Sequence, residues 1–264
     1  MFDASLVTSL ITSLQAALAD QKIWFVIAVA LGSGVVRGFS GFGGALIFIP
    51  LCSTIFGPKV GIAIFYLVDL VSATPFGYAV MPKCKWREIA PMICGHLIAL
   101  PLGTWLLINA NPLGIRWGME GVVFLMLILL VSGWRYQGQP TAPLSFGVGT
   151  VAGVMGAASG ISGPPVLAYW LGQRTNAAMI RINIMAYYAL SSSATDVIFY
   201  FRGLFTWDVV IYAILTWPAY MLGLRGGHKL FHRSTDKIFR VTAYVLIAIS
   251  AIISLPLFDE FVRK

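Results

Sequence analysis

Long stretches of this chain carry no charged side chain, and this limits its fold more than any other feature. Residues 38–58, 136–173, 209–224 and 241–258 are all uncharged. A helix needs about 20 mostly apolar residues to cross a bilayer. The whole chain is 58% apolar and 11% charged, against roughly 25% charged residues in soluble domains. The sequence therefore predicts an all-α polytopic membrane protein that has the lipid bilayer as its surroundings.

The net charge of +8 does not indicate a nucleic-acid partner. The basic residues lie in short segments between apolar runs, as Lys83, Lys85 and Arg87 do, which is typical of loops that orient a membrane protein. The three cysteines show neither the spacing of metal ligands nor a disulfide framework. We therefore expect no nucleic acid, no metal and no cofactor.

Eight apolar segments follow one another in a single membrane domain, residues 1–264. They cover residues 23–57, 60–81, 89–108, 117–134, 144–172, 182–201, 209–224 and 238–258. Ahead of them, residues 1–22 place aliphatic side chains at helical spacing, with Ser, Thr and Gln between them and no basic region in front. This pattern predicts an interfacial helix rather than a signal peptide.

Two of the eight segments are interrupted by glycine-rich breaks that resemble each other. At an offset of 119 residues, the first break matches the second through the pairs Gly34 and Gly153, Ser40 and Ser159, Gly41 and Gly160, and Gly44 and Gly163. Later segments echo one another at a similar offset. Transporter folds are often built from such repeats. The sequence predicts a first repeat over residues 23–134 and a second over residues 144–258.

The loop charges indicate how the repeats are oriented. If all eight segments span the membrane, Lys and Arg divide 8 to 9 between the two sides, leaving out Arg37. If both glycine-broken segments are re-entrant hairpins, the division becomes 11 to 6, which obeys the positive-inside rule. Each half then holds one re-entrant helix followed by three transmembrane helices, an odd number that inverts the second repeat. The alternative is that each broken segment is a single span.

The two breaks have the chemistry of an anion site. A new helix begins after each, near Ala45 and Pro164, and free N–H groups at a helix start attract anions. Glycine lets an oxyanion approach the backbone, serine adds hydroxyl donors and Arg37 adds a full charge. The candidate substrate-binding residues are Arg37, Gly38, Ser40, Gly41, Gly43, Gly44, Ser159, Gly160, Ser162 and Gly163. The alternative is close helix packing, which we expect for Gly34, Gly149 and Gly153.

A second group of polar residues lies within apolar segments. Intramembrane carboxylates are usually functional, so Asp69 and Asp196 are candidates for ion coupling or for pairing with Arg37 or Arg181; a helix–helix hydrogen bond is the alternative. His96 is a candidate for proton transfer or for a packed hydrogen bond. The full set of possible coupling or pathway residues is Asp69, His96, Arg181, Asn183, Tyr187 and Asp196.

The first break also carries a family resemblance. The stretch from Gly34 to Pro50, its shorter echo from Ser159 to Pro165, and the basic stretch from Leu222 to Leu230 resemble the TauE/SafE family of sulfite and organosulfonate exporters over about residues 24–255. The second break departs from the full glycine run at Ser162 and Pro164. The resemblance implies a multi-pass protein of the bacterial inner membrane and a small anion such as sulfite, sulfoacetate or a related organosulfonate.

Several function classes follow from these features. A secondary transporter that exports a small anion fits best, because a negative-inside potential favours export by about 2.3 kcal/mol per charge per 100 mV. The alternatives are an importer of a small sulfur oxyanion or carboxylate, and an anion channel. An intramembrane serine hydrolase is remote, since a single nucleophile does not need a repeated Ser-Gly motif; we expect no enzyme. A homo-oligomer is compatible with the sequence.

Overall fold

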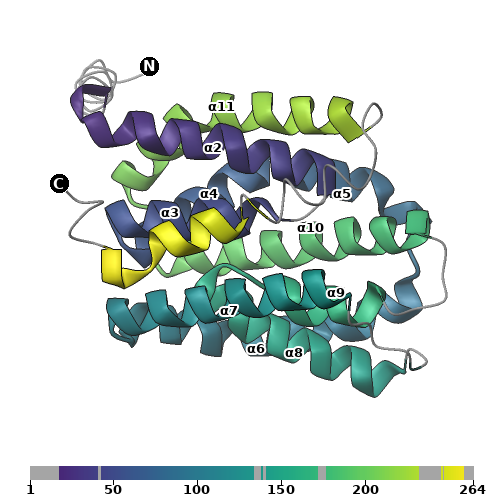
Figure 1. The fold of residues 1–264 in the computed structure, drawn as a ribbon. Coiled ribbons are helices and arrows are strands. Elements are labelled where there is room, and N and C mark those ends of the chain that lie inside the picture. Colours follow the sequence, from purple (N-terminus) through teal and green to yellow (C-terminus); the bar gives the residue numbers. More distant parts are fainter. Residues whose placement is uncertain are drawn as a thin grey trace, which may run out of the picture.

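The computed structural model describes residues 18–40, 43–133, 138, 141–171, 177–231, 245 and 247–258. All the regular structure in these ranges is helical (Figure 1). Most of the predicted interfacial helix, residues 1–17, lies outside the described residues, and so does the start of the last predicted segment. The all-α fold class is confirmed for the part that the structure describes.

The first half of the chain forms helices α2 to α7. Their bounds are α2 Gln21–Ser40, α3 Gly44–Phe56, α4 Pro58–Ser72, α5 Thr74–Val80, the 3-10 turn η1 Met81–Lys83, α6 Trp86–Asn109 and α7 Pro112–Ser132. Pro58 and Pro112 stand in the first turns of α4 and α7, where no intrahelical N–H bond is lost. The Asn111 side chain accepts the Leu113 backbone N–H and caps α7.

Fewer residues of the second half are described. Its helices are α8 Ala142–Ser159, α9 Gly163–Leu171, α10 Ala177–Phe201 and α11 Trp207–Phe231, followed by a helix over residues 247–254 and the 3-10 turn η2 Pro256–Phe258. The helix 247–254 is fixed to α7, because the buried Arg116 guanidinium donates to the Ser254 carbonyl at 2.8 Å.

Five described helices are long and apolar enough to cross a membrane: α2, α6, α7, α8 and α11. The pair α4 and α5 makes a sixth candidate, bent by 47°. The sequence predicts one segment over residues 60–81, whereas the structure bends it at Ala73, directly before Thr74 and Pro75. Pro75 cannot continue the hydrogen-bond ladder of α4. α10 has 25 residues but is not one of these five helices, because its polar side chains make it less hydrophobic.

The re-entrant hairpins are not confirmed. α2 and α8 are each long enough to cross a membrane alone. The helices after the breaks are short, 13 residues in α3 and 9 in α9. α3 begins inside the bundle, because a Cβ on Gly44 would lie 3.0 Å from Arg37 Cβ and from the Tyr220 hydroxyl. Each break therefore joins a full-length helix to a short one within the bundle.

Glycines hold together the two most extensive helix interfaces, α2 with α11 and α6 with α8. A Cβ on Gly34 would overlap the Tyr220 carbonyl, and one on Gly149 would overlap the Met92 carbonyl. Gly153 lies equally close to His96, where a Cβ would be 2.5 Å from the backbone carbonyl. These contacts confirm the packing role predicted for Gly34, Gly149 and Gly153.

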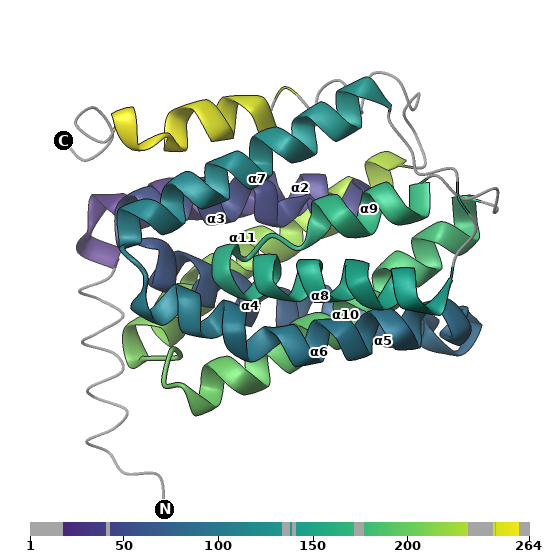
Figure 2. The same cartoon turned by 90° about the horizontal axis from the view of Figure 1, so that it is seen from below.

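The helix directions relate the two halves. α2 and α11 run from left to right in Figure 1, whereas α6 and α8 run from right to left, and Figure 2 shows the same arrangement from below. The first helix of each half therefore packs against a helix of the other half, and the two pairs point in opposite directions. The outer surface carries large apolar side chains such as Trp105, Ile128 and Phe201, which suits contact with lipid tails.

Candidate functional site

The two breaks are sharp turns made by glycine. Gly43, directly before α3, has φ 80°, and Gly160, directly after α8, has φ 75°. Residues with a Cβ rarely adopt this left-handed region. Each glycine lets the chain reverse within a few residues, so the start of the following short helix lies beside the end of the preceding long one.

The breaks meet at one small cavity of about 40 Å³, which we call the inter-break cavity. The first break contributes Gly43, and the second contributes the run from Gly160 to Gly163. The other polar lining residues are Arg37, Asp69, Tyr188 and Ser192. A cavity of this size holds a few water-sized groups, so a compact oxyanion fits it and a longer organic molecule does not.

Arg37 is the charged centre of this region and is held by a carboxylate. Its Nη2 donates to Asp69 Oδ2 at 2.8 Å, and the Tyr220 hydroxyl donates to Asp69 Oδ1 at 3.1 Å. The Arg37 and Asp69 side chains are 11% and 2% exposed. The Arg37 guanidinium also lies over the Tyr188 ring, 5.5 Å from its centroid, within cation–π range. Pairing with a carboxylate is one of the two roles expected for Arg37.

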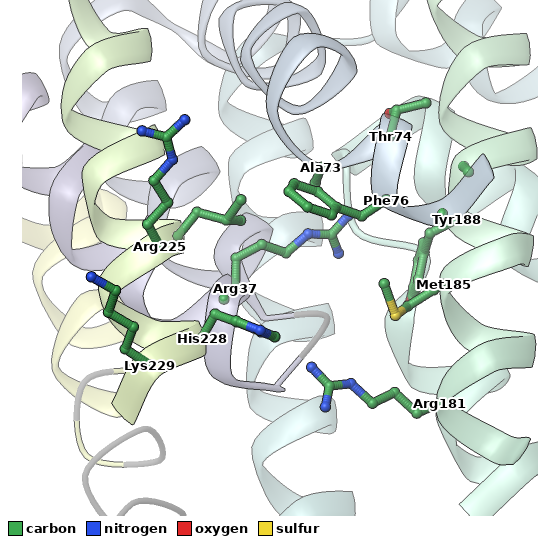
Figure 3. Close-up of a pocket in the computed structure, with 14 residues that line it drawn as sticks. Arg37, Ala73, Thr74, Phe76, Arg181, Met185, Tyr188, Arg225, His228 and Lys229 are labelled. Carbon is green, nitrogen blue, oxygen red and sulfur yellow. The ribbon is translucent and has the colours of Figure 1, made fainter. Parts of the chain in front are cut away.

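A larger cavity of about 420 Å³ opens next to the first, and we call it the vestibule. Four lining side chains are cationic: Arg37, Arg181, Arg225 and Lys229. His228 extends between Arg37 and Arg181 toward the same space (Figure 3). The rest of the wall is largely apolar, with Phe76, Met185 and Leu224 among its members. Arg37 and Tyr188 line both cavities, so they separate the vestibule from the inter-break cavity.

Comparison with known proteins identifies the family. The model of the family described as sulfite exporter TauE/SafE matches residues 26–253. The chain belongs to the TauE/SafE family. No curated protein and no solved structure matches it. The match confirms the resemblance carried by the glycine-rich breaks. It makes the chain a multi-pass membrane protein of an anion transporter family.

The structure of this TauE/SafE member brings together about half of the residues predicted for the substrate site. Arg37, Gly43, Gly160, Ser162 and Gly163 line the inter-break cavity, and Gly38 lines the vestibule. Gly44 packs beside Arg37. The Ser159 hydroxyl donates to the Met155 carbonyl at 2.7 Å, so it closes the last turn of α8. Gly41 and the Ser40 side chain lie outside the described residues.

The six predicted pathway residues lie in five different places. Asp69 lines the inter-break cavity and Arg181 lines the vestibule. The His96 Nδ1 and the Tyr187 hydroxyl form a buried hydrogen bond of 2.9 Å between α6 and α10. Asn183 accepts the Lys85 backbone N–H at 3.0 Å, which places it at the start of α6 and among the lining of neither cavity. Asp196 is buried in α10.

The structure adds polar residues to the site that the sequence did not predict: Tyr188, Ser192, Tyr220, Arg225, His228 and Lys229. Tyr188 carries a usable signal. It lies seven residues after Arg181, two turns along the same face of α10, and Met185 between them shares the vestibule wall. Tyr220 carries no such signal, because its bond to Asp69 depends on how α11 packs on α4.

Proposed function

We propose that this TauE/SafE protein is a secondary transporter that moves a small anion, namely sulfite, sulfoacetate or a related organosulfonate, out of the cytoplasm across the bacterial inner membrane. One observation carries the proposal: both glycine breaks meet beside a largely buried arginine that also lines a cationic vestibule. A charge near the bilayer centre is costly, by about 2.5–3.5 kcal/mol on insertion scales. An arginine retained there at the junction of two cavities fits an anion path.

The path begins in the vestibule. Clefts lined by one sign of charge concentrate ligands of the opposite sign, and Arg181, Arg225 and Lys229 give this cavity its positive field. The apolar wall accommodates the carbon chain of a sulfonate. The oxyanion then takes the place of Asp69 on Arg37, since a guanidinium forms the same paired hydrogen bonds with a sulfonate oxygen pair as with a carboxylate.

Beyond Arg37, the inter-break cavity offers backbone donors. The short helices α3 and α9 begin at this cavity, with Gly43 and Gly163 in its wall, and helix starts carry a partial positive charge. α3 offers more free N–H groups than α9, because Pro164 and Pro165 of α9 have none. Ser162 adds a hydroxyl group. The inter-break cavity admits the oxyanion head alone, so a longer substrate requires the helices around Arg37 and Tyr188 to move.

The distribution of basic residues supports an orientation in which the vestibule faces the cytoplasm. The vestibule residues Arg225 and Lys229 lie in the last two turns of α11. This end of α11 is on the same side of the bundle as α5, which leads directly into η1 with Lys83 (Figure 1). Basic loops stay in the cytoplasm. The antiparallel relation of the pairs α2–α11 and α8–α6 supports two inverted repeats, residues 23–134 and 144–258, which exchange access between the two sides.

Counterflow in proteoliposomes tests the function. We expect purified protein to exchange at least one anion from a panel of sulfite, sulfoacetate, thiosulfate, sulfate and small carboxylates, with saturation at high anion concentration. Arg181→Gln should weaken apparent affinity, because it removes a vestibule charge. Arg202→Gln, at the exposed turn after α10, is the matched control and should behave like wild type. An absence of exchange for the whole panel, or conductance without saturation, contradicts the proposal.

A further inference from the structure

Asp196 is a buried carboxyl group that has no role in the anion path proposed above. Its side chain is 5% exposed, near the C-terminal part of α10. Neither carboxyl oxygen has a hydrogen-bond partner among the described residues. Asp69 is the useful contrast, since both of its carboxyl oxygens are bonded, one to Arg37 and the other to Tyr220. The two intramembrane aspartates therefore have opposite surroundings.

The position of Asp196 continues the wall of the anion path. Tyr188 and Ser192 line the inter-break cavity, and Asp196 follows Ser192 by four residues on α10. Residues at this spacing share one face of a helix, with Cβ atoms about 5–6 Å apart. Asp196 thus lies one helical turn beyond the cavity that would hold the anion.

The groups around Asp196 offer it no positive charge. On α4, Tyr66 and Asp69 act on it electrostatically, and the Arg37 guanidinium is bonded to Asp69. On the other helices packed against α10, Tyr78 of α5 donates to Ser193, His96 of α6 bonds Tyr187, and Tyr169 of α9 bonds Ser145. The cations of these elements lie elsewhere. Lys59 of α4 donates to the Ile108 carbonyl, and Lys83 of η1 and Arg87 of α6 lie beside the N-terminal part of α10, where the Lys85 backbone bonds Asn183. The sequence of α9 contains no acidic or basic residue.

An ionised carboxylate is strongly disfavoured in such a place. Burying an unpaired charge is far more costly than burying the neutral acid, and the negative charge of Asp69 adds repulsion. The neutral acid is therefore the form that suits these surroundings. This preference distinguishes Asp196 from Asp69, whose charge is balanced by Arg37.

Asp196 is also connected to the second break. The Tyr66 hydroxyl donates to the Gly156 carbonyl at 3.2 Å, in the last turn of α8 before Gly160. The Tyr66 ring packs edge-on against Phe199, with centroids 5.3 Å apart, and Phe199 lies three residues after Asp196. On the same helix α4, Asp69 holds Arg37 beside the first break. The helical turn that holds Asp196 and Phe199 therefore packs on α4, which contacts both breaks.

We propose that Asp196 is a proton-binding site coupled to the anion site, so that protonation of Asp196 strengthens anion binding. This inference rests on the proposed function. An anion in the inter-break cavity stands beside Asp69 and one turn from Asp196, and a second negative carboxylate there opposes its binding. Protonation of Asp196 removes that repulsion. By linkage, the bound anion favours the protonated form to the same extent.

The proposal predicts how the rate of counterflow changes with pH. The protonated form of Asp196 accepts the anion, so counterflow is fastest in mildly acidic buffer and slows as alkaline buffer removes the proton. Asparagine has nearly the same shape as the protonated acid and cannot ionise. Asp196→Asn should therefore fold normally, keep counterflow at the acidic level, and lose most of the slowing in alkaline buffer.

The test compares wild type, Asp196→Asn and the matched control Asp208→Asn, whose aspartate is exposed at the start of α11. Counterflow is measured in acidic and alkaline buffer with the panel anion that wild type exchanges fastest. Any titration of the anion itself is the same for all three proteins. Infrared spectroscopy of the purified proteins measures the carbonyl band of protonated carboxylic acids, a readout that needs no transport.

Two results support the proposal: Asp196→Asn loses the pH dependence, and it loses part of the protonated-acid band, while Asp208→Asn keeps both. The proposal is overturned if Asp196→Asn keeps the wild-type pH dependence or if its infrared band is unchanged. A wild-type protein that exchanges no anion contradicts the proposed function instead, and the infrared comparison then still decides whether Asp196 holds a proton.

Discussion

At the residue scale, Arg37 serves both the fold and the proposed transport. In the described state its charge is balanced by Asp69, and Tyr220 occupies the second oxygen of that carboxylate. The pair is nearly fully buried. Removing one partner of such a pair leaves an uncompensated charge, which is more damaging than removing both. For mutations that break the pair, the stability of each variant must therefore be measured beside its transport or binding.

Arg37→Gln should lower the free energy of unfolding by about 3–5 kcal/mol, because Asp69 keeps its charge and loses its main partner. The double variant Arg37→Gln/Asp69→Asn should recover most of that loss, since two neutral amides replace the ion pair. Thermal unfolding in detergent of wild type, the single variant and the double variant measures this. If Arg37→Gln is as stable as wild type, the ion pair does not stabilise the fold.

At the element scale, the structure distinguishes two roles of glycine: some glycines allow close packing of neighbouring helices, and others line the inter-break cavity. Gly34 and Gly149 lie against carbonyl groups of a neighbouring helix. Gly163, the first residue of α9, has more room, because a Cβ there would be 3.5 Å from the Tyr188 hydroxyl and farther from everything else. Gly160 suits no test of this kind, since its φ of 75° strains any side chain.

Gly163→Ala should therefore leave stability close to wild type and weaken anion affinity, because the added methyl group narrows an inter-break cavity of about 40 Å³. Gly34→Ala should do the reverse and destabilise the protein by about 1–3 kcal/mol through overpacking. Gly121→Ala on α7, with open space around it, is the control for both. Thermal unfolding and counterflow are measured for each variant. Wild-type affinity in Gly163→Ala would mean that this cavity is not on the path.

Some of these elements could be predicted from sequence and others could not. The repeated glycines locate both breaks, since few residues other than glycine adopt the conformations found at Gly43 and Gly160. Pro75 is a sequence signal for the bend between α4 and α5, but the apolar residues on both sides of it favour a single continuous segment. For Asp69, opposite charge made Arg37 a candidate partner but did not select it over Arg181, and Tyr220 carried no signal. Arg37 lies 32 residues away and Tyr220 151 residues away, and only helix packing brings them together.

At the scale of the whole molecule, the cationic vestibule defines one end of the bundle. Lys229 lines it, and Lys85 is tied to α10 near Arg181 through the Asn183 side chain. In Figure 1 the turn after α10, which contains Arg202, is at the opposite end. The two ends should face opposite sides of the membrane.

Labelling of single cysteines tests this arrangement, after Cys52, Cys84 and Cys94 have been replaced. Lys85→Cys and Lys229→Cys should both react only when a membrane-impermeant thiol reagent reaches the cytoplasmic face. Arg202→Cys should react from the other face. If Lys85→Cys and Lys229→Cys are labelled from opposite sides, the inverted-repeat arrangement is wrong.

The central claim is that the anion binds to Arg37 in place of Asp69. Calorimetric titration with the anion exchanged fastest tests it most directly, using wild type, Asp69→Asn and the double variant Arg37→Gln/Asp69→Asn. A hydrogen bond to a charged group contributes about 1.5–3 kcal/mol, which corresponds to a loss of roughly 10- to 150-fold in affinity. We predict that loss in the double variant, and binding at least as tight as wild type in Asp69→Asn, where Arg37 is no longer held. Wild-type affinity in a folded double variant would contradict the account.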